Sequence, residues 1–296
     1  MTTFVELLVN GVSVGAVYAL IALGFVVIFK ATEVVNFTHA SLLLAGGYLI
    51  ARLHPVVGFW AAVSAGVAGA AVVGALVEFL VIRRGRVGSH GVLAIVTIGV
   101  DILLTTELTR QIGTDVLAMG DPWRDQVVRL GPVTIAETRL VALGVAAALI
   151  VAFLLAFKFT GWGVAMRATA EDAETAALMG VRLGRVSLSA WAVAGGLAAV
   201  AALFLCVFPT PGLDRSTAAA AMKAFPAAIL GGLDSTTGAL AGGLIVGVTE
   251  TMMSGYQGQL AFLGRGIGDA APYLVMIAIL LFRPAGLFGT KEPARV

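Results

Sequence analysis

Apolar runs of membrane-span length recur along the whole chain. A helix needs about 17–25 mostly apolar residues to cross a bilayer, and eight stretches reach or approach that length. A ninth stretch, at 218–233, is shorter and predicts either a half-helix or a full crossing. The pattern therefore predicts an all-α, polytopic membrane protein with eight to nine membrane helices, one of them short or broken. The eight expected spans are 9–29, 37–53, 58–82, 91–110, 139–158, 186–208, 238–255 and 269–283.

A polar segment at 159–185 interrupts this pattern. Thr169 and Asp172 have the spacing of a capping box, which satisfies free N–H groups at a helix start. Gly180 predicts the end of the same helix. At helical spacing one face is charged and the opposite face is small, so another protein could pack closely against it. The charged face holds Arg167, Glu171 and Glu174, and the small face holds Ala173, Ala176, Ala177 and Gly180.

Composition and charge narrow the class of protein. The 296 residues are 59% hydrophobic and 12% charged, whereas ordinary soluble domains have about 25% charged residues. No long polar stretch separates the apolar runs, which indicates one transmembrane domain over 1–296. A net charge of +2 is too small to indicate nucleic-acid binding. Cys206 is the only cysteine, which excludes an intrachain disulfide and a cysteine-based zinc cluster.

Basic residues in short loops predict the orientation in the membrane. Arg83, Arg84 and Arg86 form a cluster without a neighbouring acid, so their loop is expected in the cytoplasm. Counting spans from there places the polar segment 159–185 and the C-terminus in the cytoplasm, if 218–233 crosses. Residues 1–10 lack Lys and Arg, which fits an external N-terminus.

Glycines mark two features near the C-terminal end. From Gly238 to Gly247, glycines repeat at four-residue spacing, which lets membrane helices approach closely. Gly231 and Gly232 precede polar residues and predict a helix break. Broken helices at membrane depth line cavities or transport pathways, or are buried in protein, so either role is open for this pair.

Ionisable residues inside the spans are the next candidates. Asp101 lies near the middle of 91–110, where a carboxylate needs a partner, water or a proton. It could face a pathway or accept a hydrogen bond from a neighbouring helix. Glu107 and Arg110 are expected to form an ion pair near the outer membrane face.

The histidines and the short motifs of the chain indicate no metal site and no ATP site of its own. Asn36 and His39 open the second span and predict hydrogen bonds between helices. His39 is not a metal-site candidate, because His54 and His90 lie in other loops. The sequence has no zinc-protease motif and no phosphate-binding loop. We therefore expect no enzyme activity and no cofactor in this chain, so energy must come from another protein.

Four motifs occur in order along the chain. They are Gly15-Ala-Val-Tyr18-Ala-Leu20 followed by Asn36-Phe37-Thr-His39; Arg167-Ala-Thr-Ala-Glu-Asp172 within 163–180; Phe225-Pro-Ala-Ala-Ile-Leu-Gly231-Gly232 within 225–250; and Arg283-Pro-Ala-Gly-Leu-Phe-Gly289. Together they resemble the branched-chain amino acid type permeases of bacterial ABC importers, and the resemblance extends over nearly the whole chain.

The resemblance implies a function and a set of partners. It implies a permease subunit in the bacterial inner membrane that moves a small polar solute into the cytoplasm by alternating access. The solute would be a branched-chain or similar amino acid, an amide or a small organic acid. The implied partners are two cytoplasmic ABC ATPases that hold ATP and Mg²⁺, a second permease subunit and an external substrate-binding protein. The second permease would be a related chain or a second copy of this one.

The resemblance also gives roles to individual residues. Segment 159–185 would be a cytoplasmic coupling loop that docks into the ATPase, and polar and glycine positions of the spans would line the translocation pathway. The coupling residues are Gly163, Arg167, Glu171, Asp172, Glu174, Ala176, Ala177 and Gly180, and the pathway residues are Tyr18, Asn36, Phe37, His39, Asp101, Phe225, Gly231 and Gly232.

Two other classes remain open from the sequence. An ion-coupled secondary transporter or channel would use Asp101 and Glu107, and would work without ATP. A membrane-anchored assembly subunit would tolerate substitution of Asp101, Asn36 and the Gly231–Gly232 pair.

Overall fold

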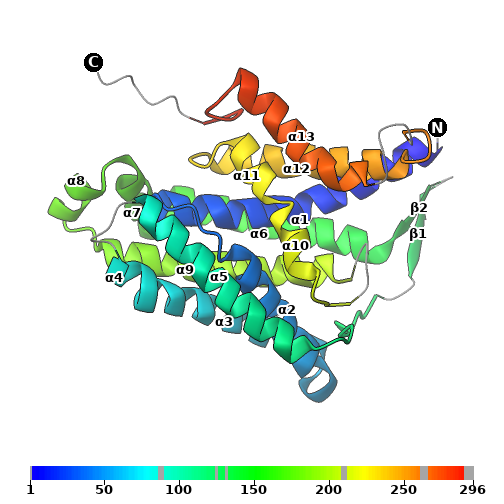
Figure 1. Ribbon diagram of the computed structural model, residues 1–296, viewed down its shortest axis with the longest axis horizontal. Coiled ribbons are helices and arrows are strands. Elements are labelled where there is room, and N and C mark those ends of the chain that lie inside the picture. Colours follow the sequence, from blue (N-terminus) through cyan, green and yellow to red (C-terminus); the bar gives the residue numbers. More distant parts are fainter. Residues whose placement is uncertain are drawn as a thin grey trace. The chain divides into compact units, whose positions relative to one another are not determined.

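The computed structural model describes residues 2–85, 90–123, 126–130, 133–207, 212–260 and 266–289. Arg86, which entered the orientation argument, lies outside these ranges. Helices make up nearly all of the described elements (Figure 1). In chain order these are α1 (Thr2–Thr32), α2 (His39–Val57), α3 (Phe59–Val77), the π-helix η1 (Glu78–Ile82), α4 (Arg83–Gly85), α5 (His90–Ile112), β1 (Val127–Leu130), β2 (Val133–Ala136), α6 (Glu137–Phe159), α7 (Gly161–Glu171), α8 (Ala173–Leu178), α9 (Leu183–Leu205), α10 (Thr217–Met222), α11 (Phe225–Gly231), α12 (Thr236–Gly255) and α13 (Ile267–Phe282).

Six helices within the described ranges are long and apolar enough to cross a membrane. They match the first six expected spans, whereas α12 and α13 are not among them. α13 has 16 residues, or about 24 Å at the rise of an α-helix, which is shorter than the ~30 Å hydrocarbon core. The six helices are Phe4–Thr32, His39–Val57, Phe59–Gly85, Gly91–Ile112, Glu137–Phe159 and Leu183–Leu205.

Two details of the expected architecture change. The stretch 218–233 forms two short helices, α10 and α11, separated by residues 223–224. The loop between α5 and α6 contains an antiparallel hairpin in which Val127 of β1 pairs with Ala136 of β2. The hairpin is a small addition to the expected all-α class, and the described fold is nearly all-α.

The chain divides into two compact units. The first comprises Met1–Val26, Asp125–Ala146 and Met222–Val296, and the second comprises Val27–Arg124 and Ala147–Ala221. The expectation of one permease domain over 1–296 remains a prediction.

Glycines bring helices of the first unit into backbone contact. A Cβ atom added at Gly15 of α1 would lie 2.9 Å from Leu244 Cα of α12, and one at Gly11 would lie 2.8 Å from Val248 Cα. Residue numbers rise along α1 as they fall along α12, so the two helices run antiparallel. On another side of α12, Gly242 faces the Ala227 carbonyl of α11. The close packing predicted from the repeated glycines is confirmed.

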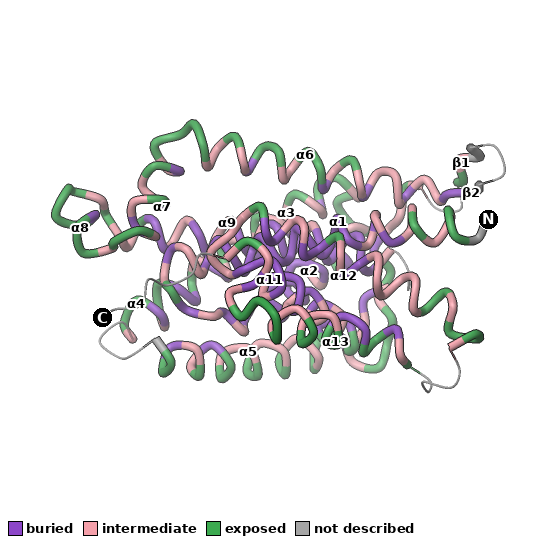
Figure 2. The backbone as a smooth tube through the Cα atoms, turned by 90° about the horizontal axis from the view of Figure 1, so that it is seen from above, coloured by how far each residue is buried: buried purple, intermediate pink, exposed green. Residues whose placement is uncertain are grey.

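In the second unit α2, α3 and α9 pack on one another. Trp191 of α9 is fully buried and clusters with Val77 of α3 and Ile28 of α1. Small residues again set the spacing, since Gly195 of α9 faces Ala70 of α3. α5 behaves differently, because only 11% of its span is buried (Figure 2). Its exposed side carries large apolar side chains, including Ile95 and Leu103, as expected for a helix that meets lipid or another chain.

Candidate functional site

The break between α1 and α2 turns its polar residues inward. Asn36, Thr38 and His39 are at most 1% exposed. Phe37 N donates to Thr97 Oγ1 of α5 at 3.1 Å, and Thr38 Oγ1 donates to the Thr97 carbonyl at 3.1 Å. Asn36 Oδ1 accepts from Thr38 N at 2.9 Å, whereas Asn36 Nδ2 has no hydrogen-bond partner in the described part of the chain. The break is thus held against α5, with one buried donor left unsatisfied.

Asp101 of α5 accepts a hydrogen bond from the backbone of α2. Its Oδ1 atom lies 3.1 Å from Ser41 N, the third residue of α2. The residue before that helix, Thr38, makes no side-chain capping bond of its own. The first N–H groups of a helix lack intrahelical acceptors and favour a negative charge. Asp101 therefore supplies, from a neighbouring helix, the cap that α2 lacks locally.

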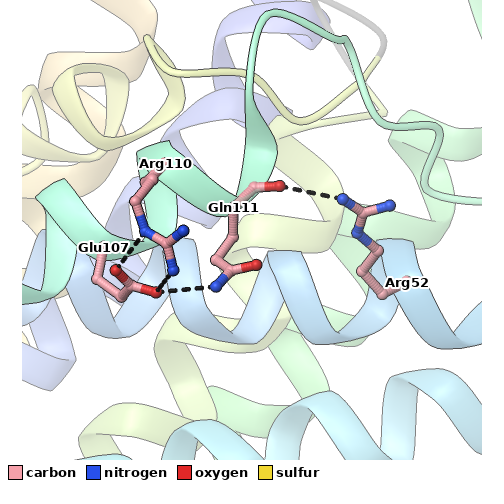
Figure 3. Close-up of polar contacts among 4 residues, drawn as sticks. All are labelled: Arg52, Glu107, Arg110 and Gln111. Carbon is pink, nitrogen blue, oxygen red and sulfur yellow. Dashed lines mark hydrogen bonds and ion pairs between the residues drawn. The ribbon is translucent and has the colours of Figure 1, made fainter.

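Glu107 and Arg110 form the ion pair that the sequence predicted. Arg110 Nη2 lies 2.6 Å from Glu107 Oε1, and Gln111 Nε2 donates to the same oxygen at 2.8 Å (Figure 3). Arg52 of α2 donates to the Gln111 carbonyl at 3.0 Å, which ties the end of α5 to α2. Both charged side chains are more than half exposed, so the pair adds little to stability.

Four polar side chains of the first unit form a connected group, the ion cluster: Tyr18, Lys223, Glu250 and Asp269. Tyr18 of α1 donates its hydroxyl hydrogen to Glu250 Oε2 of α12 at 2.7 Å. Lys223 Nζ, between α10 and α11, donates to Glu250 Oε1 at 2.9 Å and to Asp269 Oδ1 of α13 at 2.6 Å. The cluster joins segments that are up to 251 residues apart in the chain, counted as 269 minus 18.

Sequence reasoning selected only Tyr18 from this cluster. The other three lie in the stretch 218–233 and in the expected spans 238–255 and 269–283, but the sequence patterns gave none of them a role. The signal that could have found them is that each lies inside or at the start of an apolar stretch, where a charge needs a partner. Within the described ranges, no group of three His, Cys, Asp or Glu side chains is placed to hold a metal ion.

The expected helix break at Gly231 and Gly232 is present. α11 ends at Gly231, and Gly232 has a φ of +102°, a conformation that glycine adopts most readily. Ser235 then caps α12 by accepting from Gly238 N at 3.0 Å. Phe225, another predicted pathway residue, packs against Phe25, with their ring centroids 5.3 Å apart.

The polar segment 159–185 forms two helices rather than one. Thr160 caps α7 by accepting from Gly163 N at 3.2 Å, and Asp172 caps α8 by accepting from Thr175 N at 2.9 Å. Thr169 lies inside α7 and donates to the Ala165 carbonyl, so the predicted capping box is wrong. Gly180 has a φ of +91° and ends the helix as expected.

The break at Asp172 also changes which residues share a face. Asp172 is extended, with φ −157° and ψ 103°. Glu174 in α8 therefore does not continue the helical spacing of Arg167 and Glu171, which both lie in α7. Arg167 instead donates through Nη1 to the Phe157 carbonyl and lies over the Phe157 ring. The predicted charged face is therefore wrong for Glu174, whereas Arg167 and Glu171 keep their four-residue spacing within α7.

The α7–α8 segment exposes apolar side chains and is anchored to α9. Leu178 and Met179 are 83% and 82% exposed, whereas Ala176 is buried at 5%. Trp162 Nε1 of α7 donates to Ser189 Oγ of α9 at 2.7 Å. Ala177, with Leu178 and Met179, is exposed and forms what we name the α8 tip.

Hydrogen bonds from Thr175 hold the pKa of the Asp172 carboxyl below its usual value.

Comparison with known proteins decides what this arrangement belongs to. The family model described as "Branched-chain amino acid transport system / permease component" matches residues 7–282. The chain belongs to this permease family. The permease is 30% identical to LivH of Escherichia coli (strain K12), a high-affinity branched-chain amino acid transport system permease protein, over 99% of this chain and 98% of LivH.

Other relatives agree over similar lengths. BraD of Pseudomonas aeruginosa, whose name gives the same transport system, is 29% identical over 99% of the permease and 98% of BraD. A probable LivH of Methanocaldococcus jannaschii is 29% identical over 91% of the permease and 88% of that chain. The solved structure of PsaBC from Streptococcus pneumoniae in complex with Fab covers 95% of the permease and 89% of its own chain, at 16% identity and a TM-score of 0.43. That likeness is too weak to inform the fold.

Proposed function

We propose that the permease is the membrane subunit of an ATP-driven ABC importer for a branched-chain or similar small amino acid. The observation that carries this proposal is the family match over 7–282. LivH and BraD are named as permeases of branched-chain amino acid transport systems. ATP and Mg²⁺ would be held by two cytoplasmic ATPase subunits, and the solute would be delivered by an external binding protein.

We propose that the α7–α8 segment is the coupling element. The α8 tip offers exposed apolar side chains to a partner, and exposed apolar groups clustered together mark interaction sites. The hydrogen bond from Trp162 to Ser189 would pass a displacement of α7 to α9. Ala176 is buried inside the chain, so the contact would be made by Ala177, Leu178 and Met179 rather than by the whole small-residue face.

The pathway, orientation and assembly belong to the same proposal. The broken segments at Asn36–His39 and Gly231–Gly232 would line the pathway, and the buried, unsatisfied Nδ2 of Asn36 supports this for the first of them. α10–α11 as a broken crossing, followed by α12 and α13, would bring the six spans to nine crossings. The N-terminus would lie outside and the C-terminus in the cytoplasm. A second permease, related or identical, would cover exposed surface such as that of α5.

The test uses the importer reconstituted in proteoliposomes with its ATPases and external binding protein. Leu178→Glu and Met179→Glu should each reduce ATP-driven leucine uptake by about 30-fold, because an interface hot spot contributes roughly 2 kcal/mol. Both variants should also lose copurification with the ATPase. The control is Val56→Glu, which changes an 81% exposed residue at the end of α2 and should retain the ATPase.

Two results would contradict the proposal in different ways. ATPase copurification and uptake at wild-type levels in both α8-tip variants would refute the coupling role. Leucine uptake that needs no ATP and follows a proton or sodium gradient would refute the importer itself.

A further inference from the structure

The ion cluster is an unusual feature of an apolar unit. It brings the ammonium group of Lys223 together with the carboxylates of Glu250 and Asp269, and the hydroxyl of Tyr18 binds Glu250. Charged groups in such surroundings are costly and usually serve a function. None of the helix capping or glycine packing described above requires these charges, so they call for an explanation of their own.

The two carboxylates of the cluster differ in exposure. The Glu250 side chain is 13% exposed and that of Lys223 is 24% exposed, whereas that of Asp269 is 73% exposed. Removing one partner of a buried ion pair strongly destabilises a protein, because it leaves a buried charge uncompensated. An exposed ion pair contributes little to stability, so water or a solute can replace one of its partners. Glu250, held by Tyr18, is thus a fixed anchor for Lys223, and Asp269 is a replaceable partner.

Lys223 also has bonding capacity to spare. Its ammonium group carries three N–H donors, and in the described part of the chain two of them are used, one by each carboxylate. A third donor remains for an acceptor from outside the protein. Beside it, the exposed Asp269 carboxylate can accept further hydrogen bonds besides the one from Lys223.

The charges of the cluster match one kind of solute better than others. A simple anion would meet Lys223 but also two carboxylates, and a simple cation would meet Asp269 but also the ammonium of Lys223. A solute with an ammonium and a carboxylate on adjacent atoms would satisfy both, since its carboxylate would bond to Lys223 and its ammonium to Asp269.

We propose that the ion cluster is a recognition site for the zwitterionic main chain of an α-amino acid, with Lys223 binding the carboxylate and Asp269 the ammonium group. Tyr18 and Glu250 are positioning residues that hold Lys223 in place. This inference rests on the proposed importer function and adds to it a site and the charge state of the solute.

The test measures equilibrium binding of radiolabelled leucine to the purified permease–ATPase complex by scintillation proximity, without the external binding protein. Asp269→Asn and Lys223→Met should each weaken binding by about tenfold or more, because each removes a charge-assisted contact. 4-Methylpentanoate, which lacks the ammonium, and 3-methylbutylamine, which lacks the carboxylate, should compete at least about tenfold less well than leucine. Glu107→Gln, which removes an exposed carboxylate of similar pairing in α5, should bind as the wild type does.

The outcomes separate this inference from the importer proposal. If Lys223→Met fails to assemble, the exposed Asp269→Asn variant decides. Three results would overturn the recognition site. They are absence of specific leucine binding, competition by both analogues as strong as that of leucine, and wild-type leucine binding by the Asp269→Asn variant. If ATP-driven leucine uptake by the complete importer persists alongside any of these results, only the site is wrong. If the complete wild-type importer shows no such uptake, the proposed function itself fails.

Discussion

Replacing Asp101 tests whether this acid caps a helix or couples an ion to transport. Its Oδ1 atom lies 3.1 Å from the Ser41 N–H group, which is fully buried at the start of α2. Loss of an N-cap costs about 1 kcal/mol, and loss of a favourable charge at a helix N-terminus costs about 0.3–1 kcal/mol. A buried N–H left without an acceptor costs about 1–3 kcal/mol. These effects overlap, so we expect Asp101→Ala to lower the free energy of unfolding by roughly 2 kcal/mol.

Asp101→Asn separates the hydrogen bond from the charge. The asparagine keeps an acceptor oxygen and loses only the interaction of a charge with the helix dipole, so about half of the destabilisation is expected. Thermal melting of the detergent-solubilised complex should show a lower Tm by about 5 °C for Asp101→Ala and by less for Asp101→Asn. Glu107→Gln, which breaks an exposed ion pair, should leave Tm unchanged.

Transport measured on the same variants gives the decisive comparison. A capping residue acts through stability, so both variants should take up leucine at near wild-type rates below their melting temperatures. A proton ionophore should not alter uptake driven by ATP. The capping account is refuted if Asp101→Asn melts as the wild type does and yet loses uptake, which is the behaviour of an ion-coupling carboxylate.

Three further predictions concern packing, capping and anchoring. Gly15→Leu should lower Tm, because overpacking against the α12 backbone costs about 1–3 kcal/mol, whereas Gly99→Leu, at a site with open space, should not. The lowered pKa of Asp172 means that its contribution to α8 is complete above the unfolded-state pKa, about 3.9. Exchange protection of the α8 amides should therefore fall as the pH drops through the lower folded-state pKa. Ser189→Ala removes the acceptor of Trp162, worth about 1 kcal/mol, and should reduce uptake without reducing ATPase copurification.

Each of these predictions has an opposite outcome. Equal melting of the two glycine variants would mean that α1 and α12 are not in backbone contact. Exchange protection of α8 that is independent of pH, after correction for intrinsic rates, would contradict the cap. Wild-type uptake after loss of the Trp162 hydrogen bond would show that α7 moves α9 through other contacts.

Much of the fold follows from local sequence. Short-range patterns predict six spans, the glycine-mediated packing of α12, the break after Gly231 and the left-handed helix end at Gly180. Each depends on length, small side chains or the conformational freedom of glycine, which are properties of neighbouring residues. The same patterns did not separate α7 from α8. Thr169 and Asp172 have the spacing of one capping box, whereas in the structure Thr160 caps α7 and Asp172 caps α8.

The partners of the charged residues came only from the tertiary structure. The sequence by itself determined a helical membrane chain of the permease family and singled out Asp101 as an acid that needs a partner. It could not say that the partner is the start of α2, 60 positions away. Nor could it join Tyr18, Lys223, Glu250 and Asp269, because spacing along the chain carries no information about side chains that meet across helices. The distances between those helices are set by glycine packing, and only the folded chain brings the four groups within hydrogen-bond reach.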